Sequence, residues 1–264
     1  GDLAKRGVEV CKADFDQESS VLAEALAGAE RMLLVSTDAL DRPGHRYEQH
    51  KRAIEAAVRA GVGHVVYTSL AHAAKDSPVL IASDHVQTEA ALEESGLGYT
   101  TLRNNLYADL LLMSLPAALA SGRLFAAAGS GGAAYVTRED CARTAAAVLT
   151  DSFDGKRQLE VTGPETVTYA DLASLAHALT GKPVEYVAVD EVALVAGMIQ
   201  GGVPEPVARL MASFDIGMAR GLFGPATDVV ESLTGHKPQS VRAFLEANRD
   251  HLVGGAHNGN GGRS

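Results

Sequence analysis

The stretch His64-Val65-Val66-Tyr67-Thr68-Ser69-Leu70 decides the fold of this chain. It consists of mostly apolar, β-favouring residues that run into two hydroxyl side chains, and an amphipathic helical pattern precedes it. This pattern is typical of a buried parallel strand whose carboxyl end opens onto a crevice. Ligands of open α/β sheets sit at such carboxyl ends, so Thr68 and Ser69 are the first candidate site residues.

Neighbouring segments repeat this alternation of strand and helix. Residues 31–37 and 98–103 are predicted strands that also end in polar side chains. A helix is predicted over 46–60, and it stops at Gly61, a favourable residue after a helix end. The connections are long enough for parallel pairing. The sequence therefore predicts an α/β fold with a parallel sheet.

Other segments carry weaker patterns. Residues 7–16 alternate like a short strand that ends in an acidic turn. Residues 104–120 predict one long apolar helix, and residues 125–136 predict two short strands around a glycine turn. From Asp190 onward only helical patterns occur, and the glycine-rich tail over 253–264 is expected to be disordered.

Composition excludes several classes of protein. The 264 residues carry a net charge of −10 without a basic stripe, which argues against a nucleic-acid binder. No apolar run reaches membrane-spanning length, and the N-terminus does not resemble a signal peptide. Cys11 and Cys141 share no metal-binding spacing, and no His-x-x-x-His pair occurs, so we expect no metal site. We expect a cytoplasmic protein with reduced thiols.

Several short motifs carry a family resemblance. They are Ala13-Asp14-Phe15, Leu33-Leu34-Val35-Ser36-Thr37, Gln49-His50, Tyr67-Thr68-Ser69-Leu70, His85-x-x-Thr88-Glu89, Tyr99-Thr100-x-Leu102-Arg103-Asn104, Val136-Thr137-Arg138 and Gly202-Val203-Pro204-Glu205-Pro206. In this order and spacing the chain resembles the NmrA-like branch of the atypical short-chain dehydrogenase/reductases. Within that branch it is most similar to the NAD(P)H-dependent quinone reductase and triphenylmethane reductase type.

The resemblance implies a Rossmann-like parallel sheet with helices on both faces, which binds NADP(H) or NAD(H). Residues 1–150 would form this incomplete dinucleotide-binding domain, and residues 151–252 an interleaved, mostly helical substrate lobe. The implied activity is an oxidoreductase that transfers hydride from the cofactor to a quinone-like or aromatic electrophile. The implied partner is a small-molecule substrate, with no nucleic acid and no membrane, and a homodimer is one arrangement to test.

Site residues follow from the resemblance and from the strand ends. The cofactor-binding candidates are Asp14, Phe15, Ser36, Thr37, Thr68, Ser69 and Asn104, and the substrate-binding candidates are His85, Asn105 and Tyr107. The Tyr-x-x-x-Lys pair of the wider superfamily is not visible, so we assign no catalytic residue.

Each candidate also has a purely structural interpretation. The hydroxyls at the strand ends could cap local turns, and Phe15 could belong to the core. Asn104 could cap the following helix, and His85 could be an exposed histidine in a first helical turn.

Members of this family begin with a strand, a Gly-x-x-Gly-x-x-Gly turn and a helix, and none of these is present in the 264 residues. One interpretation is that about 40 residues precede Gly1 in the working protein. The other is a rearranged sheet, or one that borrows a strand, with cofactor binding lost or changed. Two alternative functions follow: a dinucleotide-binding redox sensor without turnover, or a cofactor-free isomerase or cyclase on the same scaffold.

Overall fold

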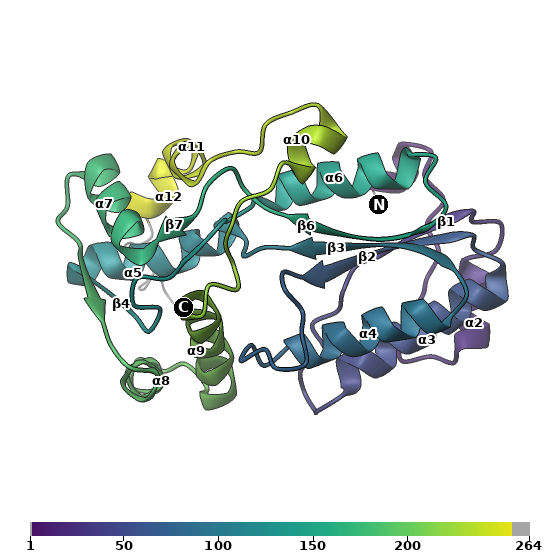
Figure 1. The fold of residues 1–264 in the computed structure, drawn as a ribbon, viewed down its shortest axis with the longest axis horizontal. Coiled ribbons are helices and arrows are strands. Elements are labelled where there is room, and N and C mark those ends of the chain that lie inside the picture. The colour runs from purple at the N-terminus through teal and green to yellow at the C-terminus, as the bar shows by residue number, and fades with distance from the viewer. Residues whose placement is uncertain (1, 255–264) are drawn as a thin grey trace, which may run out of the picture. The chain divides into compact units, whose positions relative to one another are not determined.

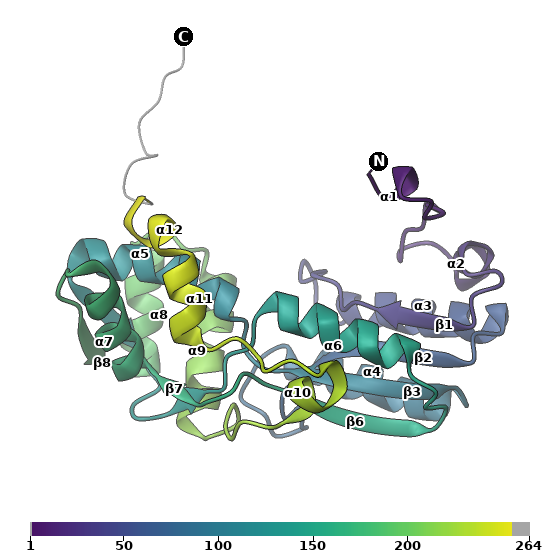
Figure 2. The ribbon, with the colours of Figure 1, turned by 90° about the horizontal axis from the view of Figure 1, so that it is seen from above.

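The computed structural model describes residues 2–254 (Figures 1 and 2). The elements are α1 (Asp2–Lys5), α2 (Ser19–Ala25), β1 (Arg31–Leu34), α3 (His45–Ala60), β2 (His64–Leu70), α4 (Ala82–Glu94), β3 (Gly98–Asn104), the 3-10 helix η1 (Ala108–Leu110), α5 (Leu111–Ser121), β4 (Arg123–Ala126), β5 (Gly132–Ala133), α6 (Arg138–Thr150), β6 (Lys156–Val161), β7 (Val167–Thr168), α7 (Tyr169–Thr180), β8 (Glu185–Ala188), α8 (Glu191–Gln200), α9 (Glu205–Ala219), α10 (Val229–Thr234), α11 (Val241–Ala247) and α12 (Arg249–Gly254). Within residues 2–254, no helix has the length and apolarity needed to cross a membrane.

A four-stranded sheet in the order β1-β2-β3-β6 forms the centre of the fold. β1 pairs with β2 in parallel, with Leu34 opposite Tyr67. Tyr67 and Leu34 are fully buried, as is most of β2. Helices α3 and α4 lie along one face of the sheet (Figure 1). The predicted parallel α/β sheet is therefore confirmed.

The described chain forms two compact units. Unit 1 contains residues 2–69, 84–102 and 148–159, and unit 2 contains residues 70–83, 103–147 and 160–254. In unit 1, the buried face of α3 packs against β1 and β2 around Ile54, Leu34 and Tyr67. α3 ends where predicted, at Gly61, which adopts a φ of +74° that side chains with a Cβ rarely tolerate. In unit 2, a second apolar core surrounds Leu115 and Phe223.

The predicted strand at 7–16 is wrong. These residues are almost all exposed and form no strand, and Figure 2 shows them outside the sheet. Within the described residues no strand pairs with them, so their alternating pattern finds no ladder of hydrogen bonds. Asp14 forms a turn instead, since its Oδ1 accepts from the Asp16 N–H and its carbonyl from the Gln17 N–H.

The two short strands predicted around the glycine turn are present as β4 and β5, whereas the helix start predicted at residue 104 is wrong. β4 and β5 do not pair with each other: β4 pairs in parallel with β8, and β5 antiparallel with β7. The helix predicted from residue 104 begins only at Leu111, after η1. Tyr107 instead forms an isolated bridge to Val136, which holds the chain extended there. Residues 255–264 of the predicted disordered tail lie outside the described residues.

Candidate functional site

In unit 1, the hydroxyls that end β1 and β2 meet. The Ser36 N–H donates to the Thr68 Oγ1 at 2.8 Å, and the Thr68 hydroxyl donates to the Ser36 Oγ at 3.3 Å. Both side chains are only partly buried, so the pair borders solvent at the carboxyl ends of two parallel strands. This is the placement that the sequence predicted for these two residues.

Ser69 lies next to this pair but faces inward. It is buried, and its hydroxyl donates to the Glu89 Oε1 at 2.7 Å. The second oxygen of Glu89 accepts from the Gln158 amide at 3.2 Å. The Ser69 hydroxyl is therefore bonded within the protein, which agrees with the structural interpretation of this residue.

A buried chain of neutral polar groups lies behind Thr37. The Thr37 N–H donates to the His50 Nε2 at 3.0 Å, which places the ring proton on Nδ1, facing the Thr88 Oγ1 at 3.0 Å. The Tyr67 hydroxyl lies 2.8 Å from the His85 Nδ1 and 3.4 Å from the His50 Nδ1. His85 is 3% exposed and bonds to Tyr67. The alternative that it is an exposed histidine in a first helical turn is therefore wrong.

Burial keeps these hydrogen-bonded side chains uncharged. Desolvation lowers the pKa of His50 to about 3, and it lowers the pKa of His85 well below its ordinary value. It also raises the pKa of the Tyr67 hydroxyl. The structure thus places two neutral imidazoles and a phenol beneath the strand ends, where a charged form would be poorly solvated.

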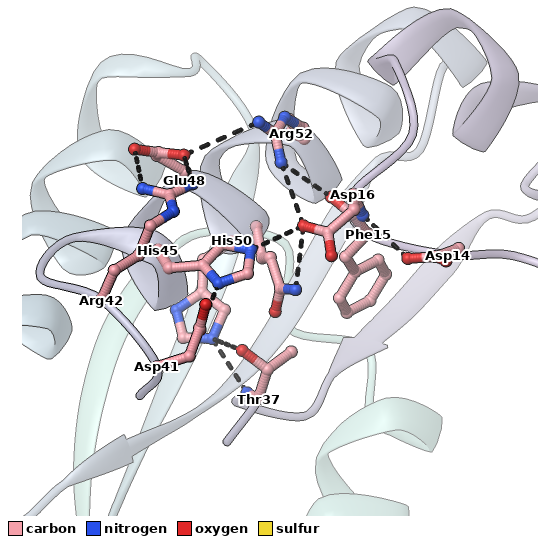
Figure 3. A network of polar contacts seen from close by, with 11 residues as sticks. Asp14, Phe15, Asp16, Thr37, Asp41, Arg42, His45, Glu48, His50 and Arg52 are labelled. Atoms are coloured by element: carbon pink, nitrogen blue, oxygen red, sulfur yellow. Dashed lines mark hydrogen bonds and ion pairs between the residues drawn. The ribbon is translucent and has the colours of Figure 1, made fainter. Parts of the chain in front are cut away.

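The cofactor-binding candidates Asp14 and Phe15 belong to a surface network with α3 (Figure 3). Phe15 packs partly against the core of unit 1, and its carbonyl accepts from the Arg52 guanidinium at 3.2 Å. His45 bridges two carboxylates, with its Nδ1 2.5 Å from Asp41 and its Nε2 2.8 Å from Asp16.

Charge complementarity holds this network together. The hydrogen bonds with Asp41 and Asp16 raise the pKa of His45, and the bond from His45 lowers the pKa of each carboxyl. The network ties the segment around residue 15 and the loop before α3 to the first turns of that helix (Figure 3). Sequence reasoning missed His45, although Asp41 and His45 stand four residues apart.

In unit 2, Asn104 ends β3 and Asn105 follows it, and the two asparagines differ in their surroundings. Asn104 is 4% exposed; its Nδ2 donates to the Tyr107 hydroxyl at 3.2 Å, and its Oδ1 is buried without a protein partner. Asn105 uses both ends of its amide, because Nδ2 donates to the Phe223 carbonyl at 2.9 Å and Oδ1 accepts from the Leu106 N–H at 2.8 Å. The Arg138 guanidinium lies 5.0 Å from the centre of the Tyr107 ring. Asn104 and Tyr107 therefore contact each other, whereas Asn105 hydrogen-bonds to backbone groups of Leu106 and Phe223.

Arg46 is a further polar residue of unit 1 that sequence reasoning missed. It is 6% exposed, and its Nε donates to the Thr37 carbonyl at 2.6 Å. Its Nη1 is buried without a partner, and no carboxylate in residues 2–254 forms an ion pair with it. A buried guanidinium is usually paired, so this one is a candidate to face an anionic or carbonyl group.

These residues fit part of a dinucleotide. The unpartnered donor of Arg46 suits a phosphate or carbonyl oxygen, and the unpartnered acceptor of Asn104 suits an amide N–H. Residues 2–254 contain no Gly-x-x-Gly-x-x-Gly turn to hold the pyrophosphate. They also contain no group of three or more His, Cys, Asp or Glu side chains that could hold a metal ion.

A family model described as the NmrA-like family matches residues 1–241. The chain belongs to the NmrA-like family. Quinone oxidoreductase 2 of Escherichia coli K12 is 37% identical over 234 residues, which cover 89% of this chain and 80% of that protein. The NAD(P)H azoreductase of Xenophilus azovorans is 28% identical over 93% of this chain and 84% of its own.

Solved structures of this family superpose closely. The NADPH-dependent quinone oxidoreductase of E. coli complexed with NADPH matches with a TM-score of 0.89 and 34% identity, over 94% of this chain and 86% of its own. The Citrobacter triphenylmethane reductase complexed with NADP(H) matches with a TM-score of 0.86 and 31% identity, over 93% and 86%. The family and the Rossmann-like fold predicted from sequence motifs are confirmed.

Proposed function

We propose that this NmrA-like protein is an NAD(P)H-dependent oxidoreductase that transfers hydride to a quinone-like or aromatic electrophile. The observation that carries the proposal is its likeness, over 94% of the chain, to a quinone oxidoreductase complexed with NADPH. Relatives named as azoreductase and triphenylmethane reductase support acceptors with extended aromatic systems.

In this proposal the nicotinamide supplies the hydride, and the chain supplies binding and orientation. Ser36, Thr37 and Thr68 hydrogen-bond the ribose or nicotinamide from unit 1, where Ser69 and Arg46 support their strand ends. Asp14 and Phe15 flank the adenine.

Within unit 2, Asn104 offers an amide oxygen and Tyr107 a phenol for ligand binding. Asn105 acts by position rather than by contact, because both ends of its amide bond to protein. His85 bonds the Tyr67 hydroxyl through its Nδ1.

The test is NADPH and NADH oxidation by the natural full-length protein with a panel of quinones, azo dyes and triphenylmethane dyes. We expect turnover with at least one aromatic acceptor and a preference between the two cofactors. Tight NADPH binding without turnover on any acceptor would instead support a redox sensor. Absence of dinucleotide binding would overturn the proposal in favour of an isomerase or cyclase.

We further propose a cytoplasmic protein that forms a homodimer. Cys11 is exposed and Cys141 buried, and neither forms a disulfide, which is consistent with a reducing compartment. Sedimentation velocity with and without NADPH tests the assembly, and cell fractionation tests the compartment.

A further inference from the structure

Unit 2 contains an apolar cavity that none of the proposed steps uses. Its volume is about 610 Å³, within the range of small-molecule sites. It lies between α5, β4 and α8, and its apolar wall includes Leu124, Phe125, Val189, Leu194 and Met198. Leu124 and Leu194 are buried, whereas Phe125 is 48% exposed at the rim.

Small side chains keep this cavity open. α5 contributes Ser114, Ala117 and Ser121, which recur at helical spacing on one face, and α8 contributes Ala193 and Gly197. A Cβ added at Gly197 would meet no atom within 4 Å. The chain therefore leaves space here, where larger residues at the same positions would close the gap between the helices.

Arg123 is the one charged side chain among the residues that line this cavity. The Ser114 and Ser121 hydroxyls already donate to carbonyls of their own helix, at 3.5 and 3.0 Å. Arg123 is the charged lining residue, and no carboxylate in the described chain pairs with its guanidinium. Glu185 stands opposite it in the β4–β8 register without forming an ion pair within 4.0 Å.

We propose that this cavity binds a small amphipathic anion: an apolar, ring-sized body with a single carboxylate or sulfonate. The apolar wall would enclose the body, and Arg123 at the mouth would pair with the anionic group. Such a site is separate from hydride transfer and adds a second ligand to the proposed oxidoreductase function.

The probe is 8-anilinonaphthalene-1-sulfonate, which combines aromatic rings with one sulfonate and fluoresces in apolar sites. We expect one saturable site on the folded protein. Gly197→Leu fills the cavity without a backbone clash and should weaken binding at least tenfold, and Arg123→Gln should weaken it about fivefold, more at low salt. The matched control Arg242→Gln, on α11 and outside the cavity, should bind the probe as the wild type does.

A neutral analogue, N-phenyl-1-naphthylamine, separates charge from shape. Gly197→Leu should weaken its binding as well, whereas Arg123→Gln should leave it unchanged. Thermal unfolding verifies that each variant is folded, and Ala193→Leu replaces Gly197→Leu if that variant does not fold. NADPH oxidation by these variants should equal that of the wild type, so a failure here does not bear on the proposed reaction.

Three results would overturn the proposal. Probe binding that is insensitive to both cavity-filling variants would place the probe elsewhere. Equal effects of Arg123→Gln on the binding of the anionic and the neutral probe would show that Arg123 does not recognise the negative charge of the ligand. A dimer that dissociates in Gly197→Leu, with no probe bound to the wild type, would show that a second copy of the chain covers the cavity.

Discussion

Asn104 and Asn105 are identical neighbours with different hydrogen-bond partners. Both are 4% exposed, and Asn104 is the last residue of β3. Only Asn104 keeps an amide oxygen without a protein partner, whereas Asn105 bonds the Phe223 carbonyl and the Leu106 N–H. Sequence reasoning had predicted one as a cofactor contact and the other as a substrate contact.

We therefore expect Asn104→Ala and Asn105→Ala to separate function from stability. Asn104→Ala should lower kcat/KM about 10–100-fold, which corresponds to loss of one or two ligand hydrogen bonds. It should lower the unfolding free energy less than Asn105→Ala does, because it removes one bond to a side chain and not two to the backbone. Asn105→Ala should lower the unfolding free energy by roughly 1–3 kcal/mol, because the Leu106 N–H loses its acceptor. Steady-state kinetics and urea unfolding measure the two effects, and equal kinetic losses would contradict the assignment.

His50 makes a prediction about acid stability. Its pKa falls to about 3 in the folded state, below the ordinary 6.5, so the unfolded chain takes up a proton first as the pH drops. The contribution of the neutral ring is complete above pH 6.5 and is lost progressively as the pH falls toward 3.

Between pH 7.5 and 5, this one group should cost about 2 kcal/mol of unfolding free energy. His50→Gln keeps an acceptor for the Thr37 N–H and a donor for Thr88, and it cannot titrate. Urea unfolding at both pH values should therefore show a pH dependence about 2 kcal/mol smaller in the variant. An equal dependence in the two proteins would indicate that His50 is solvated.

At the scale of elements, the residues that end helices were predictable because they act locally. Thr168 accepts from the Asp171 N–H while the Asp171 carboxylate accepts from the Thr168 N–H, and α7 ends before Gly181. β2 was predictable from its unbroken apolar run. The partners of β4 and β5 were not, since each pairs with a strand more than 30 residues away that no local pattern names.

The cap of α7 supplies a test at this scale. Thr168→Ala should lower the unfolding free energy by about 1 kcal/mol. The reason is that the Asp171 N–H loses its acceptor and the Asp171 carboxylate loses the bond from the Thr168 hydroxyl. Thr168→Ser retains the hydroxyl and should recover most of the loss. Thermal unfolding compares the three proteins, and an unchanged midpoint in Thr168→Ala would mean that water replaces the cap.

At the scale of the whole molecule, the order of short motifs along the chain predicted the family and the sheet. The same motifs gave residue types at strand ends but not their hydrogen bonds, so Ser36 and Thr68 were placed correctly together while His45 and Arg46 were missed. Arg46 bonds a carbonyl nine residues away, and His45 bonds one acid four residues away and a second acid 29 residues away. Only the folded chain brings such groups within reach.

Cofactor linkage gives the prediction for the molecule as a whole. Because the proposed function requires the folded protein to bind the dinucleotide, NADPH at 100 times its dissociation constant should add about 2.7 kcal/mol to the unfolding free energy. Thermal unfolding with NADPH, NADH and no nucleotide measures this. In Arg46→Met the added stability should shrink, since its guanidinium N–H no longer reaches the ligand. If NADPH stabilises Arg46→Met as much as the wild type, Arg46 does not contact the ligand and only supports the Thr37 carbonyl.

The bridge from His45 to Asp16 and Asp41 has an evolutionary corollary. One imidazolium satisfies two acids that would otherwise repel each other. Across aligned relatives, positions 16, 41 and 45 should consequently covary: a chain that replaces the histidine should also have neutralised at least one acid. Independent drift at the three positions would mean that selection does not maintain the bridge.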